Sequence, residues 1–378
     1  MTPTIHLALT DDWELRGNGT GDVREIQLRP LRRIIELYNS HGARGTVNAE
    51  VMQQLTFRRL QSRHTELKAL ADEWDEHLGE AHRQGHDVQL HLHPQWAGAT
   101  YEEGRWRLPG DWSILRHDPE AAYRMLAAGK EYLETLLRPV NPAYRCVSFR
   151  AGASAIAPSP FILRTLARLG IVFDMSIVGG MRVHTKNLQL DFTDAEETFL
   201  PFYPRMDDAR RVSDKREPII CVPIFSFRTS RRRAAAQIAS KVWRKAAQIS
   251  AAGKTAGGVA SYAAEEWADT RRLSKSALVR EKVLEPVLRG RHETADIGAL
   301  DLPALREMLR ALRRRAGASG LLEVPVVLTN HTKYVEDFGA IETFLREAAE
   351  GGDVRFVTLT DIARGLEAGK YPVRTTRS

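Results

Sequence analysis

Short apolar runs rich in β-branched residues alternate with longer stretches of mixed character along most of the chain. The apolar runs predict strands near residues 4–10, 43–48, 86–93, 145–150, 171–175, 218–224, 324–330 and 354–358. The stretches between them predict helices over 26–41, 64–84, 119–137, 158–169, 338–350 and 359–367. A repeated strand–helix order is typical of a parallel sheet with helices outside, and seven or eight units predict a closed or nearly closed α/β barrel.

Three segments interrupt this alternation. Residues 95–118 contain Trp96 among several Gly and Pro residues and are expected to form a long loop, and residues 177–217 are polar and turn-rich. Residues 228–317 are rich in Ala and Arg and are expected to be a helical insertion. The predicted organisation is therefore a barrel made of residues 1–227 and 318–378, with a basic helical insertion at 228–317.

The charge of the chain is concentrated in this insertion. The formal net charge is +7, and no acidic residue occurs between Glu217 and Glu265. Apolar residues recur there at helical spacing beside Trp243, with Arg or Lys between them: Ala235, Ile238, Val242, Ala246 and Ile249. Such a helix can pack on the barrel, which is the more common arrangement, or lie peripherally on an anionic membrane. Few aromatic residues and no recognised motif argue against nucleic acid as a partner.

Composition and the N-terminal residues bear on the compartment. A 43% hydrophobic and 27% charged composition is ordinary for a soluble globular protein. Residues 1–9 lack a basic segment followed by a long apolar run, and no stretch resembles a membrane span, so we expect a cytoplasmic protein. Cys146 and Cys221 fall inside predicted strands and are expected to be core residues, not a disulfide pair.

Polar residues follow two of the predicted strands in a way that suggests a metal site. Asp11 and Asp12 follow the first strand, and His91 and His93 end the third. Side chains two residues apart on a strand share a face and lie about 7 Å apart, so the histidines can converge on one ion. Adjacent acids normally point apart, but a turn could bring one onto the ion and leave the other beside it as a base. Carboxylate and imidazole ligands together suit a divalent ion in a hydrolytic site.

Three further strand ends carry residues of similar chemistry, namely Arg150, Asp174 and His331. An Arg beside a carboxylate keeps the carboxylate ionised and oriented, as a general base requires, and a His opposite the base can protonate a leaving amine. Because the C-terminal ends of parallel strands gather at one rim of a barrel, these residues predict one site.

The order of these motifs resembles the NodB-type polysaccharide deacetylases, carbohydrate esterase family 4, over most of the chain outside the insertion. The residues that carry the resemblance are Asp11-Asp12, Gly85-His86-Asp87-Val88 with His91, Phe149-Arg150, Phe173-Asp174-Met175-Ser176, His331 and Arg355-Phe356-Val357-Thr358-Leu359. The resemblance implies a distorted (β/α)7-type barrel. It also implies Asp11 as general base, Arg150 as its tether, His331 as general acid, and Asp12, His91 and a second histidine as metal ligands.

Two departures from the family pattern affect the site. The family's second histidine ligand stands four residues after the first, where this chain has Gln95, so His93 is taken as the substitute. The family's Arg-x-Pro-Tyr stretch is replaced by Arg150-Ala151-Gly152-Ala153, which removes an aromatic residue from the substrate groove. Trp96 and Asp174 are expected to contact substrate instead.

The resulting functional prediction is a metal-dependent hydrolase that removes an acetyl group from an N-acetylated sugar or glycan intermediate. Zinc is the expected metal for a ligand set of two His and one Asp, although manganese, cobalt, nickel and iron also accept such ligands. Two alternatives stay open, namely an amidohydrolase of the same barrel that acts on a small ureide or cyclic imide, and a non-catalytic glycan-binding relative.

Overall fold

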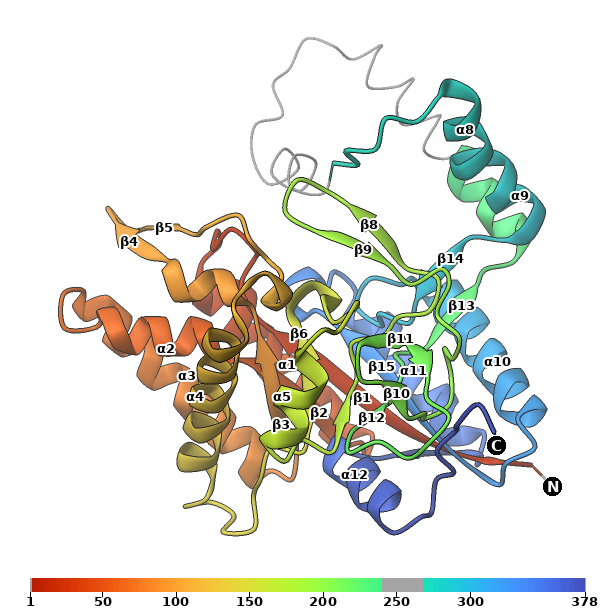
Figure 1. The fold of residues 1–378 in the computed structure, drawn as a ribbon. Coiled ribbons are helices and arrows are strands. Elements are labelled where there is room, and N and C mark those ends of the chain that lie inside the picture. Colours follow the sequence, from red (N-terminus) through yellow and green to blue (C-terminus); the bar gives the residue numbers. More distant parts are fainter. Residues whose placement is uncertain (1, 240–267, 378) are drawn as a thin grey trace.

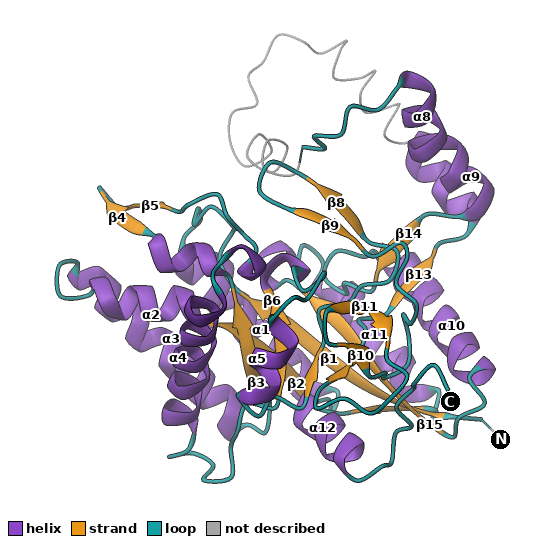
Figure 2. Ribbon diagram, in the orientation of Figure 1, coloured by secondary structure: helices purple, strands orange, loops and turns teal. Residues whose placement is uncertain are grey.

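The computed structural model describes residues 2–239 and 268–377 and contains a barrel of parallel strands surrounded by helices (Figures 1 and 2). The strands follow the order β12-β7-β6-β3-β2-β1-β15. Strand β16 pairs with the first half of β1, on the edge opposite β15. Their bounds are β1 (Thr4–Trp13), β2 (Gly45–Glu50), β3 (Asp87–Leu92), β6 (Ser148–Ala151), β7 (Phe173–Asp174), β12 (Ile220–Cys221), β15 (Glu323–Asn330) and β16 (Val354–Phe356). The expected α/β barrel is confirmed.

The barrel is nearly closed by the chain that follows β12. The amide of Phe225 donates to the carbonyl of Val327 in β15 at 2.8 Å, and the amide of Ile224 donates to the carbonyl of Ile177, just after β7, at 2.8 Å. Ile224 also forms parallel bridges to Val178 and Val327. This irregular segment, in place of a full-length strand, makes the barrel distorted.

In the part of the chain that the structure describes, eight helices pack around the strands. Their bounds are α1 (Arg29–Ser40), α2 (Val51–Leu60), α3 (Thr65–Arg83), α4 (Pro119–Leu137), α5 (Ile162–Arg168), α10 (Leu302–Ala318), α11 (Phe338–Glu350) and α12 (Leu359–Glu367). The predicted bounds of α4, α11 and α12 agree with these. Helix α2 was not expected, because it follows β2 directly with no turn residue between them. The Glu50 carboxylate ends β2 and begins α2 by accepting hydrogen bonds from the amides of Met52 and Gln53.

The strands are buried on both faces, which explains their apolar composition. Trp13 at the end of β1 packs against Trp74 of α3, with ring centroids 5.0 Å apart, and both side chains are buried.

Cys146 and Cys221 are also buried and form no disulfide. Among the described residues, no helix has the length and apolar composition needed to cross a bilayer.

The segment expected to be an insertion has two parts in the described chain. Strands β13 (Ser226–Arg228) and β14 (His292–Thr294) form a hairpin base, and α8 (Lys275–Val279) and α9 (Glu285–Arg289) extend from it. Beyond β14 the chain returns to the barrel, where Asp296 bridges Thr329 of β15 and α10 packs on α11. We therefore assign residues 292–318 to the barrel. The expected amphipathic helix around Trp243 falls largely outside the described residues.

Small antiparallel hairpins occupy the segments expected to be loops. They are β4 (Thr100–Glu102) with β5 (Arg105–Arg107), β8 (Arg182–His184) with β9 (Gln189–Asp191), and β10 (Pro204–Arg205) with β11 (Asp208–Val212).

Candidate metal centre and acid–base pairs

The end of β1 presents different residues to its two faces. The strand continues through Trp13 because Asp11, Asp12 and Trp13 pair with β2, so the alternation of side chains continues through the acids. Asp12 and Glu14 line a cavity of about 420 Å³ at the C-terminal rim. Asp11 and Trp13 point to the opposite face, toward Tyr38 of α1 and Trp74 of α3.

Asp11 is enclosed between the barrel and its helical layer. Its carboxylate accepts hydrogen bonds from the Tyr38 hydroxyl at 3.1 Å and from the Asn330 side-chain amide. Burial raises its pKa to about 7, against the lowering effect of these hydrogen bonds. Asp11 is 1% exposed and is not among the residues that line the cavity. It therefore does not have the position expected of a general base.

Asp12, in contrast, is held as a carboxylate inside the cavity. The Arg150 guanidinium Nε lies 2.7 Å from Asp12 Oδ2, and the Asn48 amide donates to Asp12 Oδ1 at 2.9 Å. Burial alone would raise the pKa of Asp12, but the charges of Arg150, His91 and His331 lower it. Arg150 thus orients an aspartate as expected, but this aspartate is Asp12 and not Asp11. Asp12 points into the cavity that Arg150 of β6 also lines, whereas Asp11 does not.

Four buried side chains form a cluster whose donor atoms all lie within 4.8 Å of one another: Glu14, Glu50, His91 and His93. Glu14 Oε2 lies 2.7 Å from His93 Nε2 and 3.6 Å from His91 Nε2. The expected pair of histidines is therefore present. Asp12, the expected carboxylate ligand, is outside this cluster, and Glu14 and Glu50 supply the carboxylates.

The atoms of this cluster meet the requirements of a divalent ion. His91 Nδ1 bonds to the Arg150 carbonyl at 2.9 Å, and its buried Nε2 has no hydrogen-bond partner. Glu50 Oε2 is likewise buried without a partner, since its other oxygen caps α2. Burial raises the pKa of Glu50 to about 8. Unpartnered imidazole and carboxylate atoms that converge in this way could hold a divalent metal ion.

Gln95 supports the second histidine. Its side-chain nitrogen lies 3.1 Å from His93 Nδ1, so Nε2 of His93 is directed at Glu14. Gln95, four residues after His91, thus contacts the second histidine of the cluster. Ligating histidines commonly have such a partner on the other ring nitrogen.

His331 and Asp296 form a second pair of charged side chains in the same cavity, beside Asp12. His331 Nδ1 lies 2.6 Å from Asp296 Oδ2, and His331 Nε2 faces Asp12 Oδ2 at 3.4 Å. Burial would lower the pKa of His331, but Asp296 raises it, so the imidazolium is favoured. Sequence reasoning missed Asp296 because it lies inside the segment expected to be an insertion, and no local pattern distinguishes it from other acids.

Lys333 was also missed, although it stands two residues after His331. Its ammonium lies 2.7 Å from Glu14 Oε1 and donates to the Leu15 carbonyl at 3.0 Å. Burial would raise the pKa of Glu14, but His93 and Lys333 hold it well below the ordinary value. Lys333 thus keeps Glu14 ionised.

The two residues expected to contact substrate lie elsewhere. Trp96 packs edge-on against both Phe57 and Trp106, and Asp174 accepts hydrogen bonds from Ser176. Neither lines the cavity, whereas Trp112 and Tyr334 do. The aromatic side chains available to a substrate therefore come from a later part of the 95–118 segment and from the chain after β15.

No family model matches the chain, and no curated protein matches its sequence. Among solved structures, it is similar to a protein from Mycobacterium smegmatis described as a polysaccharide deacetylase, with 15% identity, coverage of 99% of this chain and 94% of that chain, and a TM-score of 0.48. PuuE allantoinase is 11% identical over 96% of this chain and 90% of its own, with a TM-score of 0.48. A protein from Pseudomonas aeruginosa PAO1, also described as a polysaccharide deacetylase, is 12% identical over 95% and 90%, with a TM-score of 0.46. At these values the comparisons assign neither a family nor an activity.

Proposed function

We propose that the protein is a metal-dependent hydrolase of the NodB type that cleaves an amide, with the acetamido group of an N-acetylated sugar as its substrate. One observation carries this proposal. Two pairs of charged side chains, Asp12 with Arg150 and His331 with Asp296, line the same cavity as three of the four metal-donor residues, and His331 Nε2 lies 3.4 Å from Asp12 Oδ2.

The metal would be held by Glu14, His91 and His93, with Glu50 as a fourth donor. A divalent ion bound there, with zinc as the first choice, would polarise the amide carbonyl and lower the pKa of a water molecule. This assignment replaces Asp12 as the carboxylate ligand by Glu14, which lies two residues further along the chain, just after β1, and lines the same cavity.

Asp12 is the general base in this proposal. Its low pKa keeps it ionised, and Arg150 fixes its orientation, so it can accept a proton from the attacking water. The water oxygen then bonds to the carbonyl carbon. The Asn48 side-chain amide donates to Asp12 Oδ1. Asp12 Oδ2 is therefore the oxygen that faces Arg150 and His331.

His331 is the general acid. Asp296 favours its protonated form, so its Nε2 can donate a proton to the amine nitrogen as the carbon–nitrogen bond breaks. The products are acetate and the free amino sugar. Trp112 and Tyr334 at the cavity wall supply apolar surface of the kind that packs against sugar rings.

The proposal is tested by measuring acetate release from N-acetylglucosamine and its short oligomers. Protein stripped with a chelator should be inactive, and addition of zinc should restore acetate release. Allantoin serves as the comparison substrate, because turnover of allantoin without acetate release would indicate the ureide alternative. Binding of the oligomers by metal-loaded protein without any product would indicate a non-catalytic relative and contradict the proposal.

A further inference from the structure

A helical arm extends from the β13–β14 base and differs in its packing from the other helical regions among the described residues. We define the arm as residues 275–289, which comprise α8, a wider helical turn at Arg280–Leu284, and α9. None of its residues is buried. Figure 1 shows the arm at the edge of the molecule, away from the barrel strands.

The apolar side chains of the arm point outward. Six of the eight large hydrophobic residues that are exposed in the described chain belong to it: Leu278, Val279, Val283, Leu284, Val287 and Leu288. Leu288 is 61% exposed and Leu284 is 50% exposed. Monomeric soluble proteins rarely leave large apolar patches in water, so six exposed apolar side chains within one 15-residue segment favour a contact surface.

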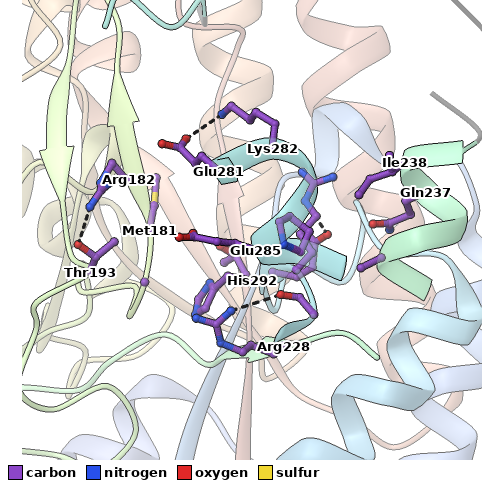
Figure 3. A pocket seen from close by; sticks show the side chains of 17 residues that line it. Met181, Arg182, Thr193, Arg228, Gln237, Ile238, Glu281, Lys282, Glu285 and His292 are labelled. Atoms are coloured by element: carbon purple, nitrogen blue, oxygen red, sulfur yellow. Dashed lines mark hydrogen bonds and ion pairs between the residues drawn. The ribbon is translucent and has the colours of Figure 1, made fainter. Parts of the chain in front are cut away.

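The polar side of the arm faces inward. Glu281, Lys282 and Glu285 line a cavity of about 790 Å³ between the arm and the β8–β9 hairpin, and none of the six apolar residues lines it (Figure 3). An amphipathic helix that packs on its own domain has the opposite orientation, with the apolar stripe inside. The arm is therefore oriented to present its apolar face to a partner.

The charge beside this face identifies the partner. Residues 271–291 carry seven basic side chains and two acidic ones. Arg272, Lys275 and Arg289 are exposed and form no ion pair within the described part of the chain. Apolar residues accompanied by exposed Arg and Lys are typical of helices that lie at the surface of an anionic bilayer.

We propose that the arm docks the protein on anionic phospholipid, with the apolar face inserted at the headgroup boundary. A second copy of the chain fits this face poorly. In a two-fold interface the same patch meets itself, which would bring the two basic segments together with few acids to offset them. The cavity behind the arm meets the candidate metal cavity at Met181 and Thr294, which line both. Docking thus places the approach to that site beside the lipid surface.

The test uses the full chain and co-sedimentation with vesicles of phosphatidylcholine, with or without phosphatidylglycerol. Wild-type protein should bind the vesicles that contain phosphatidylglycerol and should be released by high salt. Leu288→Ser should weaken binding about tenfold, because one leucine leaves the lipid. Leu322→Ser is the matched control, since Leu322 is 59% exposed but lies outside the arm, and it should bind as wild type. Both substitutions are at the surface and should leave the melting temperature unchanged.

Three outcomes would overturn the proposal. The first is equal binding by Leu288→Ser and wild type, or no binding by either. The second is a dimer in solution that Leu288→Ser converts to a monomer, which would make this face a protein interface. The third is strong hydrogen-exchange protection of residues 278–288 without vesicles, which would mean that the chain itself covers the face.

Discussion

At the C-terminal rim, two neighbouring acids on opposite faces of β1 have pKa values shifted in opposite directions. On the cavity side, Asp12 meets the Arg150 guanidinium, and its pKa is lowered. On the helix side, Asp11 meets only neutral donors, and burial raises its pKa to about 7. Both carboxyls are about 1% exposed, so the sign of the shift is decided by whether a cation is in contact.

The sharpest test of this comparison is the pair Asp12→Asn and Asp11→Asn. We expect Asp12→Asn to lower acetate release about 10³- to 10⁴-fold, because it removes the proposed base and leaves Arg150 buried without its anion. Asp11→Asn should change the rate little, since the Asp11 oxygens bond to Tyr38 and Asn330, which do not line the cavity. Zinc content, measured by mass spectrometry, should stay near wild type in both. Loss of activity in Asp11→Asn with full zinc content would place the base on the outer face.

The pH dependence of stability should differ between these two acids. Asp11 has a folded-state pKa of about 7 against 3.8 in the unfolded chain. The folded state therefore retains the Asp11 proton to a higher pH than the unfolded state does. Wild type therefore loses stability as pH rises from about 4 to 7, by up to about 4 kcal/mol from this group. Asp11→Asn removes that loss, so its free energy of unfolding should rise relative to wild type across this range. Urea unfolding at pH 4, 6 and 8 measures the difference, and a constant offset between the two proteins would show that Asp11 is ionised when folded.

A smaller effect is expected from Gln95→Ala. Removing the contact to His93 Nδ1 frees the ring to rotate, which should weaken zinc affinity about 10- to 100-fold without removing a ligand. Competition with a chelating dye measures this affinity. Glu14→Gln is the comparison, because loss of a ligand should weaken binding further. If Gln95→Ala binds zinc as wild type while Glu14→Gln does not, Gln95 has no part in orienting His93.

Much of the fold was predictable because local periodicity reports which residues are buried. Short apolar runs identified all the barrel strands, and the bounds of α4, α11 and α12 agree with the structure. Helix α2 was missed because Glu50 ends one element and caps the next with its own side chain, which leaves no turn residue as a signal.

The sequence by itself determined the strand–helix order, the rim that carries the polar residues, and the His91 and His93 pair. The tertiary structure alone decided which acid faces the cavity. Both faces of β1 are buried, so the hydrophobic pattern does not distinguish them. The pairing with β2 extends the strand to Trp13 and directs Asp12 and Glu14 inward. Asp296 reaches His331 through contacts between residues far apart in sequence, which no local pattern encodes.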